Sequence, residues 1–433
     1  MKITSLLFGI FSGCISLPLA CAADYTWNGG NASWTDSGAW LLDGNAADWV
    51  NGSNALFQTG STLAVGSGIS ASGLLYEGVA VTLNGGSLTL TGNASGSNGG
   101  SATLSGTALT LNAADAEDAW TVRDTSLSGS STLTKTGNGT VTLSGTHTAN
   151  GTWNINEGTL VFTGTRDITG GGGGQINIAS GAVLDTSEGR LFHAANYASN
   201  WEQPTITLNG GTLKLNQFGY NSASLGCLQN NFYALKFSSG TTSRVVISQG
   251  YESGGTGSRG IYIAGWGTTA VIELGANQTF TWSSSNGQNF DSIVCESGAG
   301  SALQLDVGEN SVFNFDQKFA NKNTANEYGA PTTSNFSGLS LIKSGSGELV
   351  IKRANTISSG RVVRVDAGKL TLDVDNAFGT GSGLGGVNIA SGALLSMNGH
   401  TLNNTIEVVS GATLDRGAVP TPAWSTGMKG AFS

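Results

Sequence analysis

The feature that most constrains the fold is a cassette that occurs twice. The stretch LTKTGNGTVTLSGTHTANGTWNINEGTLVFTG begins at Leu133, and LIKSGSGELVIKRANTISSGRVVRVDAGKLTLDV begins at Leu341. In each copy a lysine precedes Gly-x-Gly, followed by two short alternating strands, a polar corner, and a glycine that introduces another alternating strand. A chain that repeats such a unit favours a solenoid, in which each coil stacks on an equivalent coil.

A shorter pattern recurs more often. It reads apolar-x-apolar, two or three small residues including glycine, then apolar-x-apolar, as in VTLNGGSLTL at Val81, ITLNGGTLKL at Ile206 and IEVVSGATLD at Ile406. Alternation at period two places every second side chain on one face of a strand. The pattern at Val81 therefore predicts an inward set and an outward set, which are Val81, Leu83, Leu88 and Leu90 against Thr82, Asn84 and Thr89.

The same reasoning applies to the first cassette. Val141 and Leu143 are predicted to point inward, and Lys135 is predicted to be the first exposed polar residue of a turn. Gly137 and Gly139 are predicted to sit where the backbone needs a positive φ.

Helical signals are almost absent, because glycine recurs too often for a helix of ordinary length. Short strands with regular turns leave a sandwich, a barrel or a solenoid, and only the solenoid explains a cassette that recurs along the chain. We therefore expect an all-β, right-handed parallel β-helix. With 20 to 25 residues per coil, the chain forms roughly 16 to 20 coils and a rod on the order of 80 to 95 Å long.

The cassettes also resemble a known family. LTKTGNGTVTLSG followed by EGTLVF, and LIKSGSGELVIK followed by AGKLTL, are similar to the autotransporter-associated β-strand repeat of bacterial passenger domains. The opening YTWNGGNASWTDSGAW at Tyr25 resembles the Trp-rich start of secreted proteins that carry this repeat. The resemblance implies a β-helix and export by a Gram-negative cell. It also implies a C-terminal membrane barrel, whereas a polar tail follows the last coil at Leu414.

The first residues predict an export signal over 1–22. Lys2 precedes the apolar run from Ile3 to Leu19, and Ala20-Cys21-Ala22 matches the small-residue pattern at a cleavage site. Lipid attachment at Cys21 is the alternative, disfavoured by Pro18. We expect a secreted or cell-surface protein, with the periplasm as an open alternative, and no membrane span in the mature chain.

The pattern divides the rest of the chain into five segments. Residues 23–125 form a Trp-rich N-terminal cap and the first coils, 126–189 a β-helix repeat, and 190–266 an aromatic-rich insertion or irregular coils. Residues 267–415 form a β-helix with the second cassette, and 416–433 a polar tail. The four tryptophans of the first segment indicate a cap over the open first coil, and an aromatic surface for sugars is the alternative: Trp27, Trp34, Trp40 and Trp49.

The segment 190–266 is where we expect a ligand surface, if one is present. Aromatic rings stack on sugars and anchor protein interfaces, although they also pack beneath long loops. The candidate residues are Trp201, Tyr220, Tyr233 and Trp266. Cys227 and Cys295 are the cysteines left after the signal, so a disulfide between them or a pair of free buried thiols is expected.

Charge excludes nucleic acid as a partner. Removing the signal removes Lys2, so 18 basic and 28 acidic residues remain, a formal charge of −10. Phosphate binding requires clustered lysine and arginine, and only 11% of the chain is charged. No cofactor is expected, and the oligomeric state is left open.

Three motifs imitate enzyme signatures. Lys135-Thr136-Gly137 and Ser340-x-x-Lys343 match the K-T-G and S-x-x-K of serine β-lactamases, but in reversed order and within β-cassettes. The G-x-G-x-x-G from Gly381 to Gly386 is followed by an alternating strand, where a dinucleotide site needs a helix. All three are interpreted as β-turn sequences.

Metal sites are not expected either. The glycine run from Gly171 to Gly174 is followed by Gln175 and lacks the aspartate of a calcium loop. The three histidines are widely separated and are predicted to be surface or corner residues: His147, His193 and His400.

Two classes of function remain, with a third possibility beside them. A structural and adhesive rod that contacts glycans or surface proteins is favoured, and no enzymatic activity is expected. The rival is a polysaccharide lyase or glycosidase, which needs acids gathered on one face of the rod. The available acids have spacings that do not bring them together: Asp167 beside Arg166, Asp185, Asp373 with Asp375, and Asp415 beside Arg416. The third possibility is a truncated autotransporter passenger without independent activity.

Overall fold

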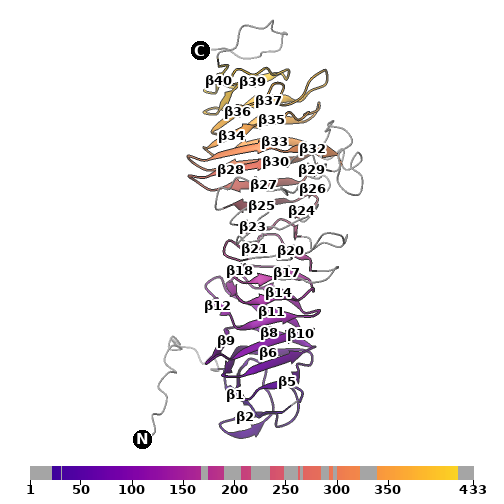
Figure 1. Cartoon of the computed structure of the whole chain (residues 1–433), viewed down its shortest axis with the longest axis vertical. Helices are drawn as coiled ribbons and strands as arrows, with labels where there is room; N and C mark the ends of the chain where they lie inside the picture. The colour runs from indigo at the N-terminus through magenta and orange to yellow at the C-terminus, as the bar shows by residue number, and fades with distance from the viewer. Residues whose placement is uncertain are drawn as a thin grey trace.

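The computed structural model describes residues 22–30, 32–166, 174–189, 206–215, 235–247, 262–263, 267–283, 292–295, 300–321 and 339–417. Every element named along these residues is a β-strand, and the strands stack as rungs of a rod from β1 and β2 at one end to β39 and β40 at the other (Figure 1). This is the expected parallel β-helix, because successive coils pair in parallel along its length.

One uninterrupted ladder runs the whole length of the rod, and we call it the long ladder. It contains 16 strands joined by parallel pairings: β1 (Asp24–Trp27), β4 (Ser53–Phe57), β6 (Ile69–Glu77), β9 (Ala94–Ser97), β12 (Ala119–Val122), β15 (Thr140–Leu143), β18 (Thr159–Phe162), β21 (Val183–Asp185), β23 (Thr212–Leu215), β25 (Thr242–Ile247), β27 (Thr269–Leu274), β30 (Ser301–Val307), β33 (Leu339–Ser344), β35 (Val362–Val365), β37 (Gly386–Ile389) and β39 (Ile406–Val408). Fifteen steps of about 4.8 Å give ~70 Å for this ladder.

A second ladder, the side ladder, starts at the first half of β6. It continues through β8 (Ser87–Leu90), β11 (Ala108–Asn112), β14 (Thr132–Thr136), β17 (Trp153–Ile155), β20 (Ile176–Ile178), β22 (Ile206–Leu208), β24 (Leu235–Phe237), β26 (Tyr262–Ile263), β29 (Ser292–Cys295) and β32 (Lys318–Asn321).

Shorter parallel sheets complete the coils. Near the N-terminal end they are β5 (Ser61–Ala64), β7 (Ala80–Asn84), β10 (Ser101–Ser105) and β13 (Thr125–Ser128), then β16 (Thr146–His147) and β19 (Thr165–Arg166). Toward the C-terminal end they are β28 (Thr279–Ser283), β31 (Val312–Asp316), β34 (Glu348–Ile351), β36 (Lys369–Leu372), β38 (Leu394–Ser396) and β40 (Thr413–Asp415).

The coils are not all the same length. Leu88 pairs with Leu109, 21 positions later, whereas Gln304 pairs with Ile342, 38 positions later. Most coils near both ends are close to the expected 20 to 25 residues, although the first has 30, and the coils of the middle are longer. The described strands of the segment 190–266, which are β22 to β26, pair with coils on both sides and belong to the stack.

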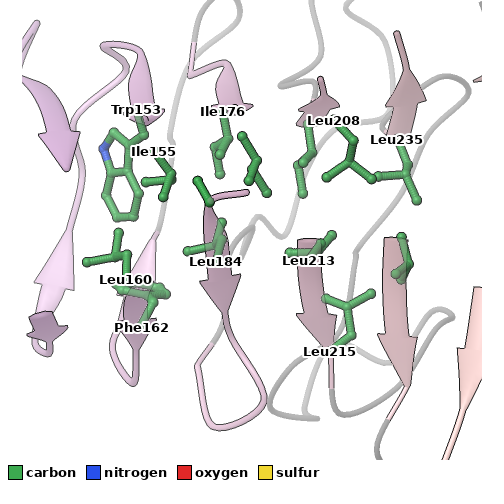
Figure 2. Close-up of a cluster of buried hydrophobic side chains, with 14 of the residues drawn as sticks. Trp153, Ile155, Leu160, Phe162, Ile176, Leu184, Leu208, Leu213, Leu215 and Leu235 are labelled. Carbon is green, nitrogen blue, oxygen red and sulfur yellow. The ribbon is translucent and has the colours of Figure 1, made fainter. Parts of the chain in front are cut away.

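The interior is filled by the apolar side chains of alternating positions. Val81, Leu83, Leu88 and Leu90 are all buried, as are Val141 and Leu143, which confirms the inward sets. Figure 2 shows Trp153 and Ile155 of β17 facing Leu160 and Phe162 of β18 across the interior. Each coil therefore buries its residues against its own opposite side and against the coils above and below.

Tryptophans pack together at the N-terminal end of the rod, in the segment predicted to form a cap. β2 (Trp40–Leu42) pairs antiparallel with β1 and with β3 (Asn45–Ala47), so the cap breaks the parallel pattern. Trp27, Trp34 and Trp40 are buried, and half-buried Trp49 packs against Trp34 and Trp40. The enclosed rings of Trp27, Trp34 and Trp40 cannot stack on a sugar.

Candidate functional site

The cassette lysine is buried, and the prediction that Lys135 is an exposed turn residue was wrong. Its side chain lies in the interior, and its Nζ donates hydrogen bonds to the carbonyl oxygens of Thr136 at 2.8 Å, Gly137 at 2.7 Å and Glu157 at 3.2 Å. The ammonium group thus binds its own turn and the turn of the next coil.

The second cassette repeats this arrangement. Lys343 is also buried, and its Nζ donates to the carbonyl oxygens of Ser344 at 2.6 Å, Gly345 at 2.7 Å and Ala367 at 3.1 Å. We call this arrangement the lysine clamp. It links two successive coils at a glycine turn.

A lysine can occupy this interior position because its stem is apolar and its head is not. Lys135 lies in register between Leu111 of the preceding coil and Ile155 of the next, in a column of buried apolar residues. Burial lowers the pKa of Lys135 to about 8, opposed by the negative charge of Glu157, and it lowers the pKa of Lys343 to about 8, opposed by Asp306. Three carbonyl acceptors offset the cost of desolvating each ammonium.

The glycines of the cassette have two different roles. Gly137 has a φ of +73°, as predicted, but Gly139 is not among the residues with positive φ. Gly139 is needed for close approach instead, since a Cβ there would lie 2.5 Å from the carbonyl oxygens of Asp115 and Asp118. Gly158, on the next coil, combines both roles: its φ is +59°, and a Cβ would lie 2.5 Å from the carbonyl oxygens of Gly137 and Gly139.

The two cassettes occupy different ladders. In the first, the lysine lies on β14 of the side ladder and the turn leads to β15 of the long ladder. In the second, the lysine lies on β33 of the long ladder and the turn leads to β34. The cassette is therefore displaced by one strand around the coil between its two copies.

His147 and Arg166 are buried, so His147 is not the surface residue that was one of its two predicted positions. They pair in register on β16 and β19. The Arg166 guanidinium carbon lies 4.5 Å from the centre of the Trp153 ring, and its terminal nitrogens donate to the carbonyl oxygens of Gly151 and Gly174. Burial lowers the pKa of His147 to about 4, and the charge of Arg166 acts in the same direction.

One cluster of charged side chains was not found from the sequence. Arg244 Nη1 contacts Glu273 Oε2 and lies 3.6 Å from Asp306 Oδ2. The three residues come from β25, β27 and β30, successive rungs of the long ladder, and Glu273 pairs in register with Asp306. They stand 29 and 33 positions apart. No sequence signal marks them, because only the register of long coils of unequal length brings them together.

The acids considered from the sequence have separate partners. Asp185 lies 3.6 Å from Lys214 Nζ, and Asp373 lies 3.0 Å from Lys352 Nζ. Asp415 accepts hydrogen bonds from Ser396 Oγ at 3.1 Å and from the backbone of Gly417 at 3.0 Å.

Asp375 lies at a corner of the rod. It accepts hydrogen bonds from the backbone and hydroxyl of Thr401, which hold its pKa below the ordinary value, and it lies 3.4 Å from His400 Nδ1. His400 is thus the corner residue that was expected.

The motifs that imitate enzymes are parts of the β-structure. Ser340 and Lys343 lie on β33, where the Ser340 hydroxyl accepts a hydrogen bond from the backbone of Val362 at 3.3 Å. Gly381 and Gly383 have positive φ, and the glycine motif leads into strand β37, not a helix.

Other predicted residues lie outside the described part of the chain: Trp201, Tyr220, Tyr233, Trp266, Cys227, His193, Asp167, Gly171 to Gly173, and the signal residues up to Cys21. Cys295 pairs with Ile263 through the backbone of β29, and its side chain lies outside the described atoms. The ligand surface and the disulfide stay predictions.

Within the described ranges, no three or more histidines, cysteines, aspartates and glutamates are grouped so that they could hold a metal ion. Over the same ranges, no helical segment has the length and apolar character that a membrane crossing requires.

Comparison with protein families identifies the first cassette. Residues 133–162 match the family model of the passenger-associated-transport-repeat, and these residues are β14 to β18, including the lysine clamp. This repeat is associated with passenger domains of autotransporters, so the chain carries a repeat of the passenger type. Comparisons with curated proteins and with solved structures gave no match.

Proposed function

We propose that the chain is a structural and adhesive rod of the cell surface or the medium, which contacts glycans or other surface proteins through its outer faces. The observation that carries this proposal is the order of its outward polar side chains. On one face Thr62, Thr82, Thr103 and Ser126 stand in register on four successive coils. On the next face another row is formed by Thr89, Thr110, Thr134 and Asn154.

Such rows suit repeated, weak contacts with a long polar partner. Hydroxyl and amide groups both donate and accept hydrogen bonds, as sugar hydroxyls do. Rungs about 4.8 Å apart repeat the same groups along the rod. Contacts that are individually weak gain in strength when many of them are held on one rigid frame.

The aromatic residues predicted from the sequence supply a second kind of contact. The test is binding of the full chain to a glycan array, compared with a variant in which Trp201, Tyr220, Tyr233 and Trp266 are replaced by alanine. We expect the variant to lose binding while its β-sheet circular dichroism is unchanged. Equal binding by both proteins contradicts a role for these rings, and absence of binding by the full chain contradicts glycan adhesion.

Substitution is the right design here, because deletion of the segment 190–266 would remove rungs of the stack. β22 to β25 pair with β20, β21, β26 and β27 on either side. A matched variant replaces three outward threonines of the polar rows, Thr82, Thr103 and Thr110, by valine. This control keeps the aromatic residues and separates the two contact surfaces.

A second candidate function is cleavage of a polysaccharide, and the cluster of Arg244, Glu273 and Asp306 is the observation that favours it. Two carboxylates and a guanidinium on one face of a parallel β-helix are the kind of grouping that such chemistry requires. The test is release of reducing ends from acidic and neutral polysaccharides. We expect no release by either the native chain or a Glu273→Gln variant, and release that this variant abolishes would establish the enzyme.

A further inference from the structure

Strand β3 of the N-terminal cap has one edge without a neighbour. Among the described strands it pairs only with β2, at the N-terminal end of the rod (Figure 1), and the register places Leu42 opposite Asn45. The two residues between them, Asp43 and Gly44, have positive φ, which is typical of a two-residue hairpin turn. Hydrogen-bonded pairs alternate along such a hairpin, so the N–H and C=O of Ala46 point away from β2. Within the described residues neither group has a hydrogen-bond partner.

The side chains along this edge alternate between two sides. Ala47 and Trp49 pack against the buried core. Ala46, Asp48 and Val50 are exposed, Val50 to 56%, and Val50 is one of two exposed large hydrophobic residues of the described chain. The edge therefore offers free backbone groups, a carboxylate and an apolar side chain to a strand that lies beside it.

The charge around the edge is entirely negative. Between residues 22 and 122 the sequence has eight acidic residues and no lysine, arginine or histidine. Four of the acids belong to the cap, and no ion pair of the described residues includes them: Asp24, Asp36, Asp43 and Asp48. Over residues 339–417, by contrast, seven lysines and arginines accompany six acids. A field of one sign that is not neutralised within the chain attracts a partner of the opposite sign.

We propose that this edge binds an extended, basic segment of another protein, which adds to β3 as a further strand. Backbone hydrogen bonds to Ala46 supply the strand pairing, as in other cases of strand addition. A lysine or arginine of the segment lies opposite Asp48, and an apolar side chain covers Val50, since such cross-strand pairs stabilise a sheet. This interface is separate from the polar rows of the outer faces, so it does not depend on the proposed adhesion.

A second copy of this chain fits the edge less well than a basic segment does. Pairing of β3 with β3 of another copy brings two caps together that contain acids and no base, and like charges across a strand pair destabilise it. The described last coil carries Glu407 and Asp415 beside Arg416, so the other end of the rod offers no excess of positive charge. The charges of the cap therefore disfavour self-association and favour a basic partner.

The experiment measures binding of the full chain to a fluorescent peptide of alternating lysine and valine, with a peptide of alternating glutamate and valine as the control. We expect saturable binding of the basic peptide that weakens with added salt, and no binding of the acidic peptide. Ala46→Pro should abolish binding, because proline has no N–H to donate. The hairpin does not use that N–H, so the tryptophan fluorescence of the cap should be unchanged. A basic peptide methylated at its backbone nitrogens should also fail to bind the unaltered chain.

Two side-chain variants test the chemistry of the partner. Asp48→Asn should weaken binding about three-fold and Val50→Ser about five-fold. Glu117→Gln removes the same charge elsewhere in the stretch without bases and should leave the affinity unchanged. Equal weakening by Glu117→Gln and Asp48→Asn overturns the proposal, because the attraction would then be non-specific. Binding that survives Ala46→Pro or backbone methylation also overturns it, as does absence of binding by the basic peptide or a dimer of the chain that Ala46→Pro abolishes.

Discussion

The two cassettes make the same buried contacts inside the rod, but the residues at their corners and on their outer faces differ. Both bury a lysine that donates to three turn carbonyls, two in its own turn and one in the next coil. Both place a glycine of positive φ above that turn, Gly158 in one and Gly368 in the other, and a Cβ at either would lie 2.5 Å from two carbonyl oxygens. The repeat therefore specifies a buried device that links neighbouring coils.

Their surroundings differ. The first cassette has buried His147 at its corner, 12 positions after the lysine, where the second has buried Asn355. Near the second, Asp306 interacts with Arg244 and its charge also acts on Lys343, whereas Glu157 caps the first turn by accepting a hydrogen bond from the backbone of Gly137 at 2.8 Å. The residues inside the turn make the same contacts in both copies, because backbone groups of two coils meet there, while the corner and the outer face differ between the copies.

The largest expected effect on stability comes from replacing Gly158 and Gly368. These substitutions test whether the turns of the two cassettes exclude a side chain to the same extent. Gly158→Ala and Gly368→Ala should each lower the free energy of unfolding by about 4 kcal/mol, since the new methyl group clashes with two carbonyls at a positive φ. Gly181→Ala and Gly392→Ala are the controls, with positive φ but no heavy atom within 4 Å of the Cβ. They should cost only about 1 kcal/mol in guanidinium unfolding. Equal losses in all four variants would mean that the close contacts do not matter.

The lysine clamp is the next test. Lys135→Met and Lys343→Met keep the apolar stem and remove the ammonium, which leaves three buried carbonyls without this donor. Each should lower the free energy of unfolding by about 3 kcal/mol. Lys352→Met, at an exposed ion pair, should cost less than about 0.5 kcal/mol. A clear difference between the two cassettes in this measurement would break their equivalence.

Lowering the pH should reduce the stability contributed by the first cassette more than that of the second, because only the first has a histidine at its corner. The pKa of His147 is about 4 in the fold, below its ordinary value of 6.5, so the unfolded chain binds the proton more readily. The stability that depends on neutral His147 is complete above pH 6.5 and is lost progressively as the pH falls toward 4. From about pH 7 to about pH 4.5 this loss should be about 2 kcal/mol.

The measurement for this prediction is guanidinium unfolding at both pH values for the native chain and for His147→Gln. The variant keeps an acceptor for the backbone of Leu127, which donates to His147 Nδ1 at 3.2 Å. Carboxylates that titrate in the same range affect both proteins, so the difference between them isolates His147. An identical pH dependence would contradict the prediction.

The smallest effect on stability is expected from the ion pair of Arg244 and Glu273, on the outer face near the second cassette. Arg244 is 39% exposed and Glu273 34% exposed, so their ion pair is screened by solvent. A double-mutant cycle with Arg244→Ala and Glu273→Gln should give a coupling below about 1 kcal/mol that decreases with added salt. A coupling of several kcal/mol, insensitive to salt, would show that the outer cluster is as important as the buried clamp.

Much of the architecture could be predicted from local patterns. Alternation placed Val141 and Leu143 inside, and the tryptophans near Tyr25 marked the cap. The same alternation also places Lys135 at an inward position, two residues after Leu133, and the prediction failed because lysine was assumed to require solvent. The cluster of Arg244, Glu273 and Asp306 could not be predicted, since it depends on a register that crosses long coils of unequal length.

The sequence by itself determined which side chains of each strand face inward, where the turns occur, and that one cassette recurs. These properties depend on the period of a strand and on the backbone freedom of glycine, which are local. Only the tertiary structure decided that the cassette lysine is a buried clamp, that its copies lie on different ladders, and which charges meet on the outer face. Those properties depend on which residues stack across coils as different in length as 19 and 38 residues, and no local pattern contains that register.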